Sequence, residues 1–446
     1  MEAKRRRLAG LVGLKNVTTE ALAAITKKVH EQGSEEFSTW TINNFIKTEF
    51  AKVRFNIHLP IGEAEPFAWT LCRPDLLISY FAAQAEPFRR VMGMAIRSAG
   101  ARPLSAVLYL DEVTPGNIIR PDNQRRFWSF YLGFTECAAE HLCREEFWLP
   151  LAMLRTTIAA KVDGGMSCCI KLLLRKILMA PCNLASVGVT VVIESPVLLR
   201  AALTNLLADE SALKSVWRFK GAAGLRACGL CRNVMSLRSE LVDGQTYLVD
   251  VSCSDSSKFV LCTNEDVWEA HDRLEAAVGH MTKGDFDRFE KASGINYSSE
   301  GLLADKELRT MIGPASVTTM DWMHNFLVHG IANLEVFGFL RQCRLLLGIK
   351  FEQINTYVTA DWCWPKSQSR HKINEVFTAA RERASSEAFK ASASELMMAY
   401  PLLRKFAQDV VAPTRIGKPR VRLDLHPPPF YAQGAPHKGF LYKAPL

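Results

Sequence analysis

Three carboxylates in this 446-residue chain have the type and position that suit metal-dependent phosphoryl transfer. Asp111 follows the apolar run 105–110, and Asp209 follows the apolar run 197–207. Glu395 lies in the first half of a later helical run. In two-metal chemistry such acids hold two divalent cations ~3.5–4 Å apart, one at the attacking oxygen and one at the leaving oxygen. Each acid alone is explained as well by a loop cap or a solvated residue, so the prediction depends on their order.

The hydrophobic pattern predicts the elements that carry these acids. Short apolar runs rich in β-branched or aromatic residues indicate strands, and longer amphipathic runs indicate helices. The predicted elements, in order, are strands at 105–110, 127–134 and 147–154, a helix at 165–179, strands at 187–193 and 197–207, and a helix at 211–219. Pro150 predicts a bulge or an edge position in the third strand.

This order is that of a ribonuclease-H-like core, an α/β fold with three antiparallel strands, a helix and then parallel strands. Such a core has one acid on its first strand and another at the end of its fourth, the places of Asp111 and Asp209. Neighbouring strands lie only ~4.8 Å apart, so we expect these two acids at one edge of a mixed sheet. We expect the third acid on a helix packed against the sheet. Glu395 is our candidate, with Asp321 and Glu335 as alternatives.

A Cys-x-x-Cys pair, Cys228 and Cys231, could supply two thiolates to a tetrahedral Zn²⁺ site. The other two ligands must come from elsewhere in the chain. The candidates are Cys253 and Cys262, with His271, His280 and His324 also within reach by sequence. The alternative is a pair of buried thiols. A redox site is less well supported, because no strand–CxxC–helix pattern surrounds the pair.

A second short motif, Asp321-Trp322-Met323-His324, begins an apolar run that predicts a helix over 321–340. Asp321 suits the N-cap of this helix, and His324 would lie one turn further on the same face. A capping Asp and a His at the edge of the core explain the motif equally well.

Composition sets broad limits on the class of protein. The net charge is +9, which permits contact with nucleic acid without establishing it. No run of ~18 apolar residues and no secretory leader is evident, so we expect neither membrane insertion nor secretion. The twelve cysteines are then reduced thiols or metal ligands. The basic cluster at 4–7 suits a nuclear localisation signal, a phosphate contact or a solvated terminus, so we expect a nuclear protein or otherwise a cytoplasmic one.

These observations predict six segments. Residues 1–50 are helical and fit a helix-turn-helix DNA reader or a plain helical hairpin, and residues 412–446 form a basic, proline-rich flexible tail. Between them lie a pre-core segment at 51–100, the first part of the core at 101–219, a mostly helical insertion with the CxxC and DxxH motifs at 220–380, and the closing helix of the core at 381–411.

Three stretches resemble a transposase-like family abundant in dinoflagellate genomes. They are LYLDEVTPGN at 108–117, ADESALKSVWRFKGAAGLRACGLCRN at 208–233 and DWMHNFLVHG at 321–330. That family is similar to cut-and-paste transposases of the Plavaka and Kyakuja-Dileera-Zisupton types, relatives of CACTA elements. In that wider group an early Asp follows a strand, a second Asp precedes a CxxC, and a DxxH precedes the final acid. The matching residues here are Asp111, Asp209, Cys228, Cys231, Asp321 and His324, and the resemblance covers roughly residues 55–410.

The resemblance implies a DNA transposase that uses Mg²⁺ or Mn²⁺ to cleave a strand with water and then transfers it with a 3′-hydroxyl. Asp111, Asp209 and Glu395 would hold the ions, DNA would be the partner, and a homo-oligomer is compatible with this activity. Two departures matter: Glu112 follows the early Asp, and no motif fixes the final acid. The alternative is a catalytically inactive, transposon-derived DNA-binding protein.

Overall fold

The computed structural model describes residues 47–48, 51–114, 125–236, 247–253, 255–328, 330–360, 373–385 and 387–414. The predicted N-terminal helices, the basic cluster at 4–7 and nearly all of the predicted tail lie outside these ranges. The chain forms two compact units, residues 1–322 and 323–446, which are described separately. Within the described ranges, no helix has the length and apolar character needed to cross a membrane.

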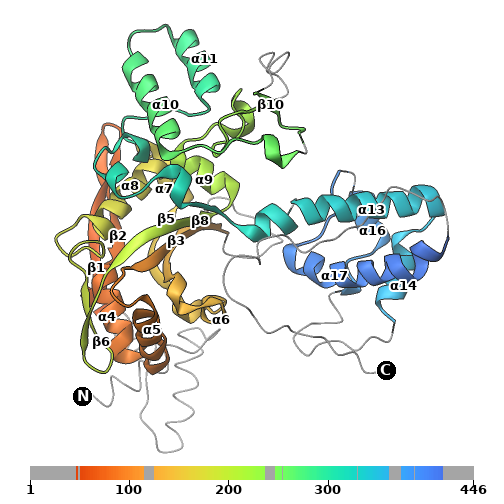
Figure 1. The fold of residues 1–446 in the computed structure, drawn as a ribbon, viewed down its shortest axis with the longest axis horizontal. Coiled ribbons are helices and arrows are strands. Elements are labelled where there is room, and N and C mark those ends of the chain that lie inside the picture. Colours follow the sequence, from red (N-terminus) through yellow and green to blue (C-terminus); the bar gives the residue numbers. More distant parts are fainter. Residues whose placement is uncertain are drawn as a thin grey trace, which may run out of the picture. The chain divides into compact units, whose positions relative to one another are not determined.

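A seven-stranded mixed sheet is the centre of unit 1 (Figure 1), with the strand order β1-β2-β5-β4-β3-β8-β11. The strands are β1 (Arg54–Ile61), β2 (Ala64–Cys72), β3 (Leu104–Val113), β4 (Phe127–Phe134), β5 (Leu149–Arg155), β8 (Ala201–Ala208) and β11 (Thr318–Met320). The first five are linked by antiparallel pairing, whereas β8 runs parallel to both β3 and β11. The sheet and its flanking helices make unit 1 an α/β structure.

Helices cover both faces of this sheet. Figure 1 shows α4 (Pro74–Gln84) and α5 (Glu86–Ala99) on one side of the strands, and α8 (Gly165–Leu178) and α9 (Glu210–Trp217) on the other. Cys169, Leu173 and Ile177 are buried on one face of α8, at the spacing that a helix needs to present an apolar stripe.

The three predicted antiparallel strands and the helices after them are confirmed. The prediction for Pro150 is also confirmed as a bulge, because Tyr131 pairs with Pro150 while Phe130 pairs with Ala152, which leaves Leu151 as the extra residue. Pro150 does not mark an edge, since β2 pairs with the other side of β5.

Three expectations about the sheet were wrong. The segment at 51–100 supplies β1 and β2 to the sheet rather than preceding it. The run at 187–193 does form a strand, β6 (Val189–Val192), but in the described part of the chain it pairs with β7 (Pro196–Leu199) in a separate two-stranded ribbon, so the run at 197–207 is divided between β7 and β8. The segment taken as a helical insertion also contributes β11 to the sheet, and the single helix expected over 321–340 is divided into a turn at Trp322 and Met323–Leu327 and the helix α13 (Ile331–Leu347).

The rest of unit 1 is mostly helical. It contains α10 (Asn264–Ala277), which begins with a capping box of Thr263 and Asp266, and α11 (Lys283–Ser293). The remaining short elements are α6 (Ala139–Leu142), α7 (Thr156–Ala159), α12 (Pro314–Val317), β9 (Val234–Met235) and β10 (Val249–Asp250).

Unit 2 is helical in its described part and has a core of its own. Its main helices are α13 (Ile331–Leu347), α14 (Phe351–Val358), α16 (Ala379–Ala384) and α17 (Ala393–Phe406). The predicted C-terminal helix is confirmed as α17, with Pro401 inside it. It begins later than expected because Ser392 caps it, its hydroxyl accepting from the Glu395 N–H.

Candidate functional site

Asp111, Asp209 and Asp321 lie at the carboxyl ends of three adjacent parallel strands. Tyr109 in β3 is level with Leu207 in β8, and Met320 in β11 is level with Ala208. Continuing both registers by one or two residues brings the three aspartates to the same level, at intervals of one strand spacing of ~4.8 Å. The prediction that the strands of Asp111 and Asp209 are neighbours is therefore confirmed. The structure adds Asp321 to the same row.

Strand alternation determines which face carries this row. Leu108 and Leu110 of β3 are buried in the core, whereas the alternate residues Tyr109 and Asp111 are only partly buried. Residues paired across parallel strands share a face, so Asp209 and Asp321 emerge on the same side as Asp111. Three carboxylates thus lie on the less buried face of the sheet.

Asp209 is held in place by the helix that follows it. Its Oδ1 atom accepts a hydrogen bond of 2.6 Å from the Ala212 N–H, which makes it the N-cap of α9. The positive end of the helix dipole also stabilises the negative charge of this carboxylate. Oδ2 is the atom left to bind a cation.

The backbone of Asp321 is held by the sheet. Its N–H donates a hydrogen bond of 2.8 Å to the Ala208 carbonyl, which continues the ladder between β8 and β11. His324, the other named residue of this motif, lies in the π-helical turn Met323–Leu327, which belongs to unit 2. Asp321 thus ends a short parallel strand and also directly precedes the helical residues that begin at Trp322, where the sequence predicted a helix start.

Tyr109 is a site residue that the sequence interpretation missed. Its phenol hydrogen-bonds Asp111, and the negative charge of Asp321 also acts on it. Burial of the ring and these two carboxylates raise the pKa of Tyr109 well above its usual value, so the phenol stays protonated as a donor. Its place two residues before Asp111 in a strand was the available signal, because such residues share a face.

Glu112 points to the opposite face of β3 from Asp111. Its Oε1 accepts a hydrogen bond of 2.7 Å from the Thr156 hydroxyl, and its Oε2 lies 3.3 Å from the Arg126 guanidinium. These contacts join β3 to the residues at the ends of β4 and β5. The carboxylate of Glu112 is therefore held by Thr156 and Arg126 and is not part of the aspartate row.

Glu395 belongs to unit 2, where two sets of partners occupy its carboxylate. The Arg381 guanidinium donates to both oxygens at 2.9 and 2.7 Å, and the Ser392 N–H donates to Oε2 at 2.7 Å. The hydrogen bonds from Arg381, followed by those from Ser392, lower the pKa of Glu395 to about 2. An acid on a packed helix face needs a partner for its charge, and Arg381 is that partner for Glu395. Glu335, the other alternative, is on α13 and exposed.

The CxxC turn brings three thiols into one neighbourhood. Cys228 hydrogen-bonds Cys231, and Cys262 is close enough to influence the Cys231 thiol. Burial, together with these two neighbours, raises the pKa of Cys231 to about 12. The Arg226 guanidinium donates to the Cys262 sulfur. Cys253 bonds instead to the Asp255 carbonyl. The sulfurs of Cys228, Cys231 and Cys262 do not all lie within 4.8 Å of one another, so the turn brings two thiols of a zinc site together and leaves the other ligands unassigned.

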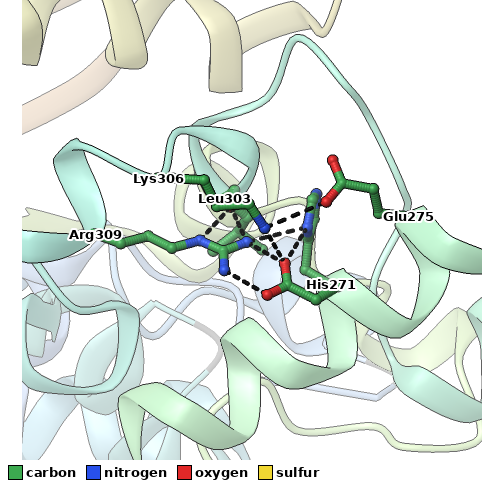
Figure 2. Close-up of polar contacts among 6 residues, drawn as sticks. His271, Glu275, Leu303, Lys306 and Arg309 are labelled. Carbon is green, nitrogen blue, oxygen red and sulfur yellow. Dashed lines mark hydrogen bonds and ion pairs between the residues drawn. The ribbon is translucent and has the colours of Figure 1, made fainter.

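A cluster around His271 is the one group of three metal-ligating side chains in the described ranges whose ligand atoms all lie within 4.8 Å of one another. Its other members are Asp272 and Glu275 of the same helix, α10. Figure 2 shows Lys306 and Arg309 beside His271 and Glu275. Arg309 donates to both Asp272 oxygens at 2.8 and 2.6 Å, and Lys306 lies 2.6 Å from Asp272 and 3.2 Å from Glu275. Two cationic side chains neutralise the carboxylates, so this group fits an ion-pair network better than a metal site.

Comparison with known proteins adds no family assignment. A scan against protein-family models and a search of curated proteins both return no match for this chain.

Proposed function

We propose that this chain is a transposase-like protein with a ribonuclease-H-like core that cleaves and transfers DNA strands with divalent metal ions. The observation that carries the proposal is the level row of Asp111, Asp209 and Asp321 at the ends of three adjacent parallel strands. The order of three antiparallel strands, helix α8, strand β8, helix α9 and strand β11 supports the fold assignment.

The aspartate row suits cations that bridge neighbouring strands. Carboxylate oxygens are ligands that Mg²⁺ and Mn²⁺ prefer. When bound, such ions activate a water or a 3′-hydroxyl and stabilise the leaving oxygen. Asp111 and Asp321 flank Asp209, so each could share an ion with it. Tyr109 orients Asp111 by its hydrogen bond, and the α9 N-terminus fixes Asp209.

Cleavage of supercoiled plasmid DNA in the presence of Mg²⁺ tests this proposal. We expect Asp111→Asn and Asp209→Asn to reduce nicking by more than about 100-fold, since even outer residues of metal sites contribute 10–100-fold. The matched control is Asp287→Asn, because Asp287 is an exposed aspartate on α11 far along the chain from either acid. EDTA should abolish nicking by the wild-type protein.

The two candidate functions give different results in this assay. Nicking that survives both Asp substitutions would refute the metal mechanism. DNA binding without any nicking by the wild-type protein would favour the catalytically inactive, transposon-derived DNA-binding protein instead.

A further inference from the structure

Unit 2 contains a cavity of about 570 Å³ whose walls come from α13, α14 and α16. This volume is in the range of small-molecule and nucleotide sites, about 300–1,000 Å³. All of its lining residues lie between 337 and 385, within unit 2. The cavity is thus separate from the aspartate row of unit 1.

The sequence of α13 builds one wall directly. Phe337, Leu340, Arg341 and Arg344 line the cavity at spacings of three and four residues, which places them on one face of the helix. At the end of α13, Gly348 adopts φ +68°, and its N–H bonds back to the Arg344 carbonyl. This left-handed turn, which favours glycine, reverses the chain so that α14 can form the next wall.

The walls carry more positive than negative charge. Four cations line the cavity, Arg341, Arg344, Lys350 and Arg383, against two acids, Glu352 and Glu382. Arg344 pairs with Glu382. Arg341, Lys350 and Arg383 are exposed and have no ion pair with any residue in the described ranges. The cavity is therefore lined by three cations without an ion-pair partner in the described ranges, and by one carboxylate, Glu352, that is not in an ion pair there.

The floor of the cavity is apolar. Leu340 and Phe351 are buried, at 3% and 6% exposure, and Phe351 packs edge-on against Phe377 and Phe389. Phe337 is half-buried in the wall. The lining thus combines exposed cations with apolar side chains, among them the half-buried ring of Phe337, which suits a ligand with anionic groups and flat apolar rings. A nucleic-acid strand has both, because its phosphates bind cations and its bases stack on aromatic side chains.

We propose that this cavity binds a nucleic-acid strand, with Arg341, Lys350 and Arg383 contacting the phosphates. The inference rests on the proposed function only for the choice of nucleic acid as the phosphate-bearing ligand. It makes unit 2 a DNA-holding part of the chain, while cleavage is assigned to unit 1.

Binding of a fluorescein-labelled oligonucleotide to the full-length chain tests the proposal. Anisotropy is measured in EDTA over a series of salt concentrations, for single-stranded and duplex forms. We expect Arg341→Gln/Arg383→Gln to weaken binding by about tenfold or more and to reduce the salt dependence by roughly 0.7–0.9 for each lost phosphate contact. The matched control removes two other exposed cations of unit 2, Lys390→Gln/Arg404→Gln, and should change affinity by less than about twofold.

Two further arms keep the test decisive if the double variant is unstable. Glu352→Gln removes the unpaired carboxylate and should strengthen binding. Arg383→Lys keeps the charge and should retain most of the affinity. Inorganic tripolyphosphate that binds as tightly as the oligonucleotide would show a general anion site and overturn the assignment to nucleic acid. Equal affinities for both double variants, with no gain in Glu352→Gln, would overturn the cavity as the binding site.

The outcome is distinguishable from that of the cleavage assay. Asp287→Asn, the control of the cleavage assay, should bind the oligonucleotide as the wild-type protein does. A charge-dependent loss of binding without any nicking would support this cavity while refuting catalysis. Nicking together with unchanged binding in the Arg variants would refute the cavity alone.

Discussion

The N–H of Asp321 donates a 2.8 Å hydrogen bond to the carbonyl oxygen of Ala208, the residue directly before Asp209. This bond places Asp321 beside Asp209 at the same edge of the sheet. Asp209 in turn follows the strand that pairs with the strand of Asp111. Three residues separated by about 100 positions each along the chain thereby become neighbours through two strand pairings.

Tyr109 should be a positioning residue for Asp111. Tyr109→Phe removes the phenol that hydrogen-bonds this carboxylate and leaves the ring in place. We expect nicking at low Mg²⁺ to fall by about tenfold, the lower end of the effect of outer residues in metal sites, with partial recovery at high Mg²⁺. Tyr131→Phe is the control, because Tyr131 stacks on Tyr109 from the adjacent strand. An equal loss at every Mg²⁺ concentration would mean that the phenol does not act through metal binding.

The sequence revealed Asp111 and Asp209 because each follows an apolar run long enough to identify a strand. Strand β11 has only three partly buried residues, Thr318–Met320, which show no readable alternation. The Trp, Met and His after Asp321 suggested a helix, and they are helical, but they gave no sign of the strand before them. The placement of Asp321 depends on a pairing with β8 across more than 100 residues, which local pattern does not contain.

For Glu395, the sequence predicts the local helix start but not the residue that pairs with its carboxylate. Ser392 and Glu395 have the S-x-x-E spacing of a capping box, which predicts a helix start from sequence alone. The ion pair with Arg381 depends on how α16 and α17 pack, so it could not be predicted. The division of the chain into two units also has no clear compositional signal. The boundary falls between residues 322 and 323, and the sequence around it is neither proline-rich nor glycine-rich.

His271 should make the stability of unit 1 depend on pH. It is buried, and this burial lowers its pKa below the usual value of about 6.5. The charge of Arg309 acts in the same direction, and the contact with Asp272 opposes it. The unfolded chain therefore takes up a proton near pH 6.5 while the folded chain does not. Stability contributed by the neutral imidazole is present above pH 6.5 and is lost as the pH falls toward the folded pKa.

The thermal unfolding midpoint, followed by tryptophan fluorescence between pH 8 and pH 5, measures this effect. We expect His271 to contribute a loss of up to about 1.4 kcal/mol for each pH unit below 6.5. His271→Gln should flatten the profile, whereas His280→Gln, at an exposed histidine, should leave it unchanged. The other groups facing His271 are Asp272, Glu275, Lys306 and Arg309, and Asp272 is held ionised by its two cations. Parallel profiles for wild type and His271→Gln would refute the prediction.

The CxxC pair, Cys228 and Cys231, should supply two ligands to one zinc ion per chain. Metal analysis of the purified protein should find zinc in the wild type and little in Cys228→Ser. The same substitution should lower the thermal unfolding midpoint strongly, because binding free energy at a structural zinc site contributes to folding. Cys182→Ser, at an exposed cysteine, is the control. Absence of zinc from the wild type, with unchanged stability in Cys228→Ser, would leave a simple thiol pair stabilised by packing.

The choice of the third carboxylate is decided by comparing Asp321→Asn with Glu395→Gln. We expect Asp321→Asn to reduce Mg²⁺-dependent nicking by more than about 100-fold, because the row of unit 1 loses one of its three members. Glu395→Gln should retain nicking and instead loosen α17, by about 1–2 kcal/mol, since it weakens a cap and an ion pair with Arg381. Hydrogen exchange of the α17 amides measures that loosening, with Glu387→Gln at an exposed position as the control. The opposite pattern, with nicking abolished by Glu395→Gln and retained by Asp321→Asn, would restore Glu395 as the third ligand. It would require the carboxylate to exchange Arg381 for a metal ion in the active state.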